Sequence, residues 1–225
     1  MMCRRFSMSA GIDEISRHFG ISRVMYYYKN RYNISPTQNT PVILHDQGEK
    51  VLDELRWGMV PYWGRDAVNA NLYSVDQNPT YRKIMDTQRC IIPSNGFYYW
   101  RTVGKKSYAV RVVSPNHKLF GVAGLYETWR DASGEKIVTC TMLMTEANIF
   151  IREFEERMPA ILSEEDIETW LNPETKGLNN LQPLLKTHTE AMRIYPVTPM
   201  VANDDHDHEQ CIEEMDLKLA WVKNL

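Results

Sequence analysis

KLFGVAGLYETWRDASGEKIVTCTMLMT, residues 118–145, is the stretch that decides the fold class. Its two ends are rich in β-branched and aromatic residues, and RDASGE joins them, with Ser133 and Gly134 supplying a turn. This pattern predicts a β-hairpin. The second run places Cys140 on the same face as alternate apolar residues, so we expect this cysteine to lie in the core.

The remaining strand and helix signals do not alternate regularly. TPVILH (40–45) and SYAVRVV (107–113) predict strands, and the apolar spacing over 12–19 predicts a short helix that Gly20 stops. A second helix is expected over EANIFIREFEE (146–156). A third helix is expected to start at Ser163, capped with Asp166, and to end at Asn172–Pro173. An irregular order of this kind favours an α+β domain built on antiparallel sheet over a doubly wound parallel sheet.

Composition narrows the class of protein. The chain has 225 residues, 43% of them apolar and 24% charged, which is typical of one soluble globular domain. Its formal charge of −3 argues against general polyanion binding but allows a local basic groove. No secretory or membrane-spanning segment is visible, so we expect a cytoplasmic protein without a membrane partner. The last part, 204–225, is predicted to be a polar loop and a C-terminal segment.

Neither a metal nor a cofactor is expected. The four cysteines are scattered without a CxxC pair, which indicates reduced thiols and not a disulfide framework or a zinc site. DDHDH (204–208) contains ligand-type residues, but contiguous alternation rarely gives good metal geometry.

Two stretches carry the residue types of a functional site. MMCRRFS begins the chain and puts Cys3 close to the amino terminus with two arginines behind it. RWGMVPYWGRD (56–66) has two tryptophans near arginines, a combination that suits base stacking with phosphate pairing. We expect Trp57 to be a core residue, which leaves Trp63 as the better candidate for stacking on DNA.

Seven short blocks occur in an order and spacing that resemble the SRAP family, the SOS response-associated peptidases or abasic-site processing proteins. The blocks are MCRRF, YNISPTQ, RWGMVPYW, NAN, RCIIPSNGFYYW, GLYETW and RMPAIL. Each is weak alone, but the ordered set is specific and spans Cys3 to about Asn203. The resemblance implies a single α+β domain with a curved, mainly antiparallel, barrel-like sheet core and peripheral helices. It also implies covalent capture of abasic sites in single-stranded DNA by an N-terminal cysteine.

The chemistry that the resemblance implies has a clear physical basis. An open abasic sugar presents an aldehyde, which an amine converts to an imine and a neighbouring thiol closes to a thiazolidine ring. An α-amine, with a pKa of about 7.7–8.0, is partly neutral at physiological pH. Arg4 and Arg5 are expected to favour the thiolate of Cys3 and to attract phosphates. All of this requires Cys3 to become the first residue, whereas two methionines precede it here. We favour Met2 as the true start, with its removal by self-processing or by an aminopeptidase.

Several site residues follow from the resemblance, and some depart from the family's pattern. Cys3 and Arg5 match, and Asn69 matches the asparagine of the family's NAR motif. Tyr99 stands at the glutamate of GFYEW, and the histidine before RMP falls near Glu155. The family's glycine after the cysteine is Arg4, and its NAR arginine is Asn71. The catalytic set is therefore Cys3, Asn69, Tyr99 and Glu155, and the DNA-binding set is Arg4, Arg5, Asn33, Trp63, Asn71 and Arg157.

These departures bear on turnover. A positioned acid or base contributes roughly 10²–10⁴ in rate, and tyrosine, with a pKa of about 10, is a poor base at neutral pH. Glu155 can supply the acid–base group in place of tyrosine if burial or Tyr99 raises the pKa of the Glu155 carboxyl group. We therefore expect covalent capture to survive in slowed form, with release and self-processing more affected.

Two other functions stay open from the sequence. One is a relative that binds damaged or single-stranded DNA without a covalent product, and the other is a cysteine peptidase. The peptidase needs a histidine near its nucleophile, and none of the six histidines falls in a family block. We expect a monomer whose partner is single-stranded DNA with abasic sites, associated with the nucleoid when bound.

Overall fold

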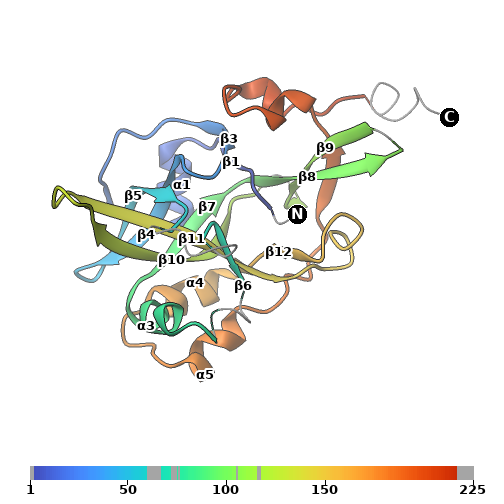
Figure 1. Cartoon of the computed structure of the whole chain (residues 1–225). Coiled ribbons are helices and arrows are strands. Elements are labelled where there is room, and N and C mark those ends of the chain that lie inside the picture. Colours follow the sequence, from blue (N-terminus) through green and yellow to red (C-terminus); the bar gives the residue numbers. More distant parts are fainter. Residues whose placement is uncertain are drawn as a thin grey trace.

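A five-stranded β-barrel forms the centre of the molecule (Figure 1). The computed structural model describes residues 3–59, 67–71, 75, 77–104, 106–115 and 118–216. Strand neighbours in the barrel are antiparallel except where β11 meets β5, and that parallel pairing, Thr139 with Arg56 and Cys140 with Trp57, closes the barrel. Its strands are β4 (Asn39–Asp46), β5 (Glu49–Trp57), β7 (Arg89–Ser94), β10 (Phe120–Arg130) and β11 (Lys136–Glu146).

The predicted hairpin is the longest ladder of this barrel. β10 and β11 pair antiparallel: Gly124 lies opposite Met142 at one end of the ladder, and Arg130 lies opposite Lys136 at the other. Gly134, with a φ of 85°, lies in the turn between the two strands. Asp131 stabilises this turn by accepting hydrogen bonds from the backbone N–H groups of Ser133 and Glu135, each at 2.9 Å. The hairpin prediction is confirmed.

A second sheet carries the amino-terminal strand. Its order is β14-β9-β8-β1-β3, all antiparallel, so β1 lies between β8 and the edge strand β3. Asn95 links β7 of the barrel to β8 of this sheet. A Cβ at Gly96 would lie 2.8 Å from Nε of the buried Arg111, so the chain passes between the sheets where only glycine fits. The strands are β1 (Phe6–Met8), β3 (Arg31–Ile34), β8 (Gly96–Val103), β9 (Lys106–Val113) and β14 (Arg193–Pro196).

Short strands add to the barrel at the end of β11. β6 (Asn69–Asn71) pairs parallel with β11, and β12 (Arg157–Pro159) pairs antiparallel with it. Met144 faces Asn71 in one register and Pro159 in the other, so segments far apart in the sequence flank the same point of β11. The other short strands are β2 (Arg23–Val24), which pairs with β5, and β13 (Ile161–Leu162), which pairs with β10.

Helices lie around the outside of the two sheets (Figure 1). The first and third predicted helices are confirmed: α1 stops at Gly20, which is left-handed, and Ser163 Oγ accepts a hydrogen bond from Asp166 N at 3.1 Å at the start of α4. α3 was not predicted. The helices are α1 (Ile12–Phe19), α3 (Pro79–Thr87), α4 (Glu164–Leu171) and α5 (Leu178–Leu181), with 3₁₀ turns at Gln182–Leu184, Pro199–Ala202 and Glu209–Cys211.

The helix expected over 146–156 is wrong. This segment forms successive turns in which Asn148 Oδ1 accepts hydrogen bonds from the N–H groups of Phe150 and Ile151, both at 3.1 Å. Asparagine competes with the helical backbone in this way. Ile149 is left 79% exposed.

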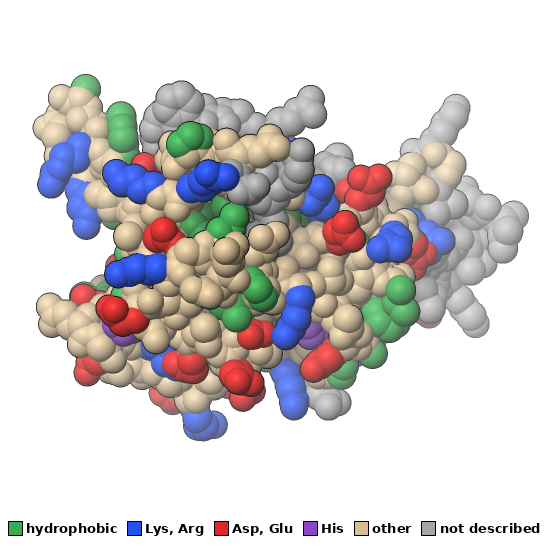
Figure 2. All heavy atoms as spheres, turned by 90° about the horizontal axis from the view of Figure 1, so that it is seen from below, with side chains coloured by type: hydrophobic (Ala, Val, Ile, Leu, Met, Phe, Trp, Pro, Cys, Tyr) green, Lys and Arg blue, Asp and Glu red, His purple; other side chains and the backbone are tan. Residues whose placement is uncertain are grey.

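The core prediction for Trp57 and Cys140 is confirmed, since both side chains are fully buried. The α+β fold with a barrel-like, mainly antiparallel core is confirmed as well. Among the described residues, no helix is long and apolar enough to span a membrane. Figure 2 shows the lower face of Figure 1, where Lys and Arg side chains are interspersed with Asp and Glu instead of forming one basic field.

Candidate functional site

Cys3 lies just ahead of β1 and is almost completely buried, with 1% of its surface exposed. Its backbone carbonyl accepts a hydrogen bond from Asn69 Nδ2, and its thiol lies 3.5 Å from the carbonyl oxygen of Arg5. Asn69 is itself 1% exposed, and its Oδ1 has no hydrogen-bond partner within the described part of the chain. The structure therefore brings together two predicted site residues, Cys3 and Asn69, that are 66 positions apart in the sequence, and leaves one buried acceptor beside Cys3.

Burial controls the ionisation of Cys3. Loss of solvent raises the pKa of the thiol to about 12, and the negative charge of Glu155 adds to this effect. Hydrogen bonds from the backbone at Arg5 and Tyr98 oppose it only partly. The prediction that the neighbouring arginines favour the thiolate is wrong for this state of the protein, because desolvation is the larger cause and the guanidinium of Arg5 is engaged elsewhere.

Arg5 is held by the segment after β14. Its Nη1 donates to Asn33 Oδ1 at 3.1 Å, its Nη2 donates to the Ala202 carbonyl at 2.8 Å, and it forms an ion pair with Asp204. Asn33 is fully buried, and its Nδ2 donates to the carbonyl oxygens of Asn203 and His206 at 3.1 and 2.7 Å. Asn33 thus supports Arg5 through its side-chain oxygen.

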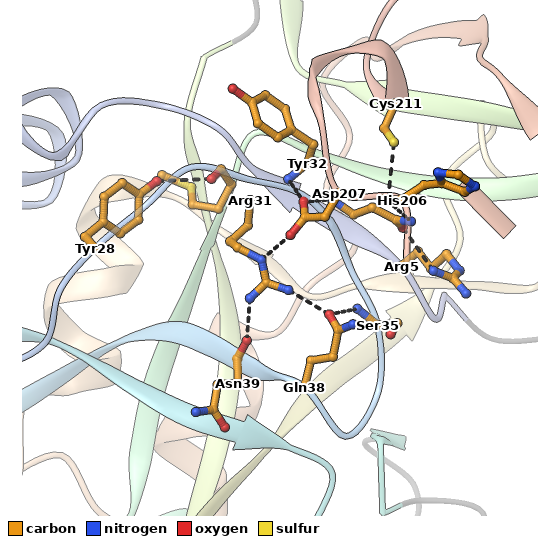
Figure 3. Close-up of polar contacts among 12 residues, drawn as sticks. Arg5, Tyr28, Arg31, Tyr32, Ser35, Gln38, Asn39, His206, Asp207 and Cys211 are labelled. Atoms are coloured by element: carbon orange, nitrogen blue, oxygen red, sulfur yellow. Dashed lines mark hydrogen bonds and ion pairs between the residues drawn. The ribbon is translucent and has the colours of Figure 1, made fainter. Parts of the chain in front are cut away.

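Asp207 fastens the same segment to β3 (Figure 3). Its carboxylate accepts hydrogen bonds from the backbone N–H groups of Tyr32 and Asn33 and pairs with Arg31. Arg31 also donates to Gln38 Oε1 at 2.7 Å and to the Asn39 carbonyl at 3.1 Å. Residues 204–208 are therefore more than the polar loop that the sequence predicted, because two of their carboxylates bind Arg31 of β3 and Arg5 just before β1.

Tyr99 and Glu155 form a second group near Cys3. Tyr99 is buried, its hydroxyl donates to the Arg157 carbonyl at 2.9 Å, and its ring stacks on Phe154 with 6.3 Å between the ring centres. Burial first, and then the nearby Cys3 and Glu155, raise the pKa of Tyr99 well above its usual value. The tyrosine is therefore neutral over the physiological range, and Glu155, which is half-buried, is the carboxylate of this group.

Asn71 and Arg157 contact each other at the end of β11. Arg157 Nη1 donates to Asn71 Oδ1 at 2.7 Å, and both side chains are half-buried. The amide at position 71 therefore fixes the guanidinium, which a second arginine there would have repelled.

A cavity of about 820 Å³ adjoins this site; Arg4, Arg5, Tyr99 and Glu155 line it, whereas the buried Cys3 and Asn69 do not. It brings together three arginines and three carboxylates with a wall of aromatic rings. Sequence reasoning missed Asp204 and Phe154, the first because it stands in a polar run and the second because it lies within the helix expected over 146–156. The charged residues are Arg4, Arg5, Arg101, Glu153, Glu155 and Asp204.

Some predictions concern residues that the structure does not describe, or sites it does not contain. Trp63 and the two methionines before Cys3 lie outside the described residues. Within the part of the chain that is described, no group of three or more His, Cys, Asp or Glu side chains is placed to hold a metal ion. The cysteines at 3, 90, 140 and 211 are all free.

Comparisons with known proteins agree on one family. The model of the SOS response associated peptidase (SRAP) family matches residues 2–204. The abasic site processing protein YoqW of Bacillus subtilis is 33% identical over 222 residues, covering 94% of this chain and 99% of that protein. The abasic site processing protein YoaM of the same organism is 32% identical over 222 residues, covering 94% and 98%. A crystal structure of a Bacteroides thetaiotaomicron protein aligns with a TM-score of 0.79 at 25% identity, covering 95% of this chain and all of that one.

Proposed function

This chain belongs to the SOS response associated peptidase (SRAP) family, and from that premise we propose that it captures abasic sites in single-stranded DNA through a covalent bond to Cys3. The names of the relatives YoqW and YoaM, both abasic site processing proteins, support the substrate class. The observation that carries the proposal is the hydrogen bond that Asn69 donates to the carbonyl of Cys3, next to Arg4 and Arg5, which line an adjoining cavity.

The reaction needs an amine and a thiol on one residue. The α-amine of Cys3 attacks the sugar aldehyde and one water leaves, which gives an imine. The thiol then adds to the imine carbon, its proton passes to the nitrogen, and a five-membered thiazolidine ring closes. Because the α-amine must be free, the residues before Cys3 have to be removed first, by self-processing or by an aminopeptidase.

Asn69 is suited to orient this amine. Its Nδ2 group already holds the carbonyl of Cys3, and its buried Oδ1 is an acceptor without a partner in the described chain. An N–H of the freed α-amine beside that oxygen would satisfy it, and a buried acceptor left alone costs about 1–3 kcal/mol.

Glu155 is suited to move protons. The Cys3 thiol has a pKa raised to about 12, so it reacts only when a base takes its proton. Glu155 is the carboxylate that acts electrostatically on both Cys3 and Tyr99. Tyr99, neutral and bound to a backbone carbonyl, positions the Arg157 segment instead of exchanging protons. This exchange of roles relative to the family's glutamate and histidine is expected to slow capture without abolishing it.

The flanking strand needs cationic and polar contacts. Arg4, Arg5 and Arg157 are proposed to bind phosphates, and Asn71 to hold Arg157 in place. Asn33 is proposed to act through Arg5, and Trp63 to stack on a base.

Incubation with single-stranded DNA that contains one abasic site tests this function. The wild type should give a product that survives denaturation, with the mass of a Cys3-linked strand, and Cys3→Ala should give none. The intact mass of the purified protein should show Cys3 as the first residue. A retained methionine, or an equal amount of product from Cys3→Ala, would reject the covalent mechanism. Salt-sensitive binding with no covalent product would instead identify a non-covalent DNA-binding relative.

A further inference from the structure

A carboxylate of the chain itself, that of Asp204, already binds an arginine at the wall of the cavity near Cys3. The carboxylate of Asp204 forms an ion pair with Arg5 at the wall of the cavity, and both residues line it. Across the cavity, Glu153 pairs with Arg101 at 3.4 Å. Two of the arginines that line the cavity, Arg5 and Arg101, are therefore paired with carboxylates of the same chain.

The two members of the Arg5 pair differ in how freely they can move. The Arg5 side chain is 12% exposed and is fixed by the buried Asn33 and by the Ala202 carbonyl. The Asp204 side chain is 57% exposed. Since the guanidinium is held and the carboxylate faces water, exchange at this position happens by loss of Asp204 and not by movement of Arg5.

We infer that Asp204 occupies the position of a backbone phosphate on Arg5 and is displaced when single-stranded DNA binds, so that this carboxylate sets the affinity for DNA. The inference rests on the proposed function in one respect, that DNA enters the cavity beside Cys3. Carboxylate and phosphate oxygens are both acceptors for a guanidinium, and they compete for the Nη2 group of Arg5 that Asp204 now binds. Exposed ion pairs are weak, so displacement costs little and the competition is partial.

The alternative is that Asp204 only fixes Arg5 and that phosphates bind elsewhere. In that case its removal would loosen Arg5 and weaken binding. The two readings predict opposite signs for a neutral substitution, which makes the affinity for DNA the deciding measurement.

The test compares Asp204→Asn with Asp205→Asn in the full chain. Both changes remove one negative charge from neighbouring exposed positions, but Asp205 contacts the protein through its backbone N–H, which donates to Asn203 Oδ1 at 3.1 Å. The probe is a short fluorescein-labelled oligothymidine strand without an abasic site, so that no covalent step contributes, and binding is followed by fluorescence anisotropy.

Asp204→Asn is expected to bind this strand about two- to fivefold more tightly than the wild type at low salt, and the gain should shrink as salt rises. Asp205→Asn should stay within about 1.5-fold of the wild type. Asp204→Glu keeps the charge and should also stay close to the wild type, and Asp204→Ser serves as a second neutral variant if Asp204→Asn unfolds.

The inference would be overturned if Asp204→Asn and Asp204→Ser bind the DNA strand only as tightly as Asp205→Asn. It would also be overturned if they bind the strand more weakly than the wild type. A gain by Asp204→Asn without any covalent product on abasic DNA would support the inference and reject the covalent step of the proposed function. Absence of binding by the wild type and every variant would reject the inference, whereas the proposed function would still be decided by the crosslinking assay on abasic DNA.

Discussion

Replacement of Asp207 by alanine should destabilise the protein more than any other change to the polar run 204–208. The carboxylate accepts hydrogen bonds from two backbone N–H groups of β3, at Tyr32 and Asn33, and pairs with Arg31 (Figure 3). β3 is the edge strand of its sheet, so among the described strands these N–H groups have no neighbour to bond with on that side.

The magnitude follows from the two hydrogen bonds and the ion pair that the substitution removes. Two amides left without an acceptor cost about 1 kcal/mol each, at the lower end of the range because the Asp207 side chain is 24% exposed and water can enter. The pair with Arg31 adds about 1 kcal/mol, since Arg31 keeps its bonds to Gln38 and Asn39. The sum is about 3 kcal/mol, which for a chain of this size lowers Tm by about 6–12 °C.

Thermal unfolding followed by circular dichroism measures this change. Asp205→Ala is the matched control and should lie within about 2 °C of the wild type, because its carboxylate is exposed. Asp207→Asn keeps an acceptor for the backbone but loses the charge, so it should fall between the two. If Asp207→Ala unfolds within about 2 °C of Asp205→Ala, the carboxylate does not hold β3, and the expected loss of stability is refuted.

Three further outcomes are expected. Glu155→Gln should slow formation of the covalent product by about 10²-fold or more while DNA binding is kept, as measured by single-turnover crosslinking; an unchanged rate would remove Glu155 from the mechanism. Cys3 should react slowly with iodoacetamide at pH 8 and about tenfold faster for each pH unit above it, because burial raises the pKa of its thiol to about 12. The protonated thiol's contribution to stability is fully present below about pH 9 and should be lost as the pH rises towards 12. Fast labelling of Cys3 at pH 8, detected in a peptide map, would contradict the raised pKa. Gly124→Ala should lower the free energy of unfolding by about 1–3 kcal/mol, since its Cβ would lie 2.9 Å from Cys90 Sγ and 3.1 Å from the Thr141 carbonyl, whereas Gly134→Asn, in an open turn, should cost less in the same denaturant titration.

Local sequence signals predicted those elements whose determinants are close together in the chain. The turn at Ser133–Gly134, the stop at Gly20 and the Ser163 cap each depend on a few neighbouring residues, and all three are present. The helix expected over 146–156 is absent, because the conformation of this segment does not depend on neighbouring residues alone. There the side chain of Asn148 and the pairing of β12 with β11 determine the backbone conformation.

By itself the sequence determined the α+β class, the hairpin at 118–145, the buried state of Trp57 and the ordered family blocks that include Cys3 and Asn69. The pairing of charged side chains, by contrast, became visible only in the folded chain. The arginines near Cys3 were expected to activate its thiol, but the polar run after residue 203 folds back onto Arg5, and burial keeps the thiol protonated. Desolvation and ion pairing depend on atoms that are close in space and distant along the chain, and no local pattern of residues carries that information.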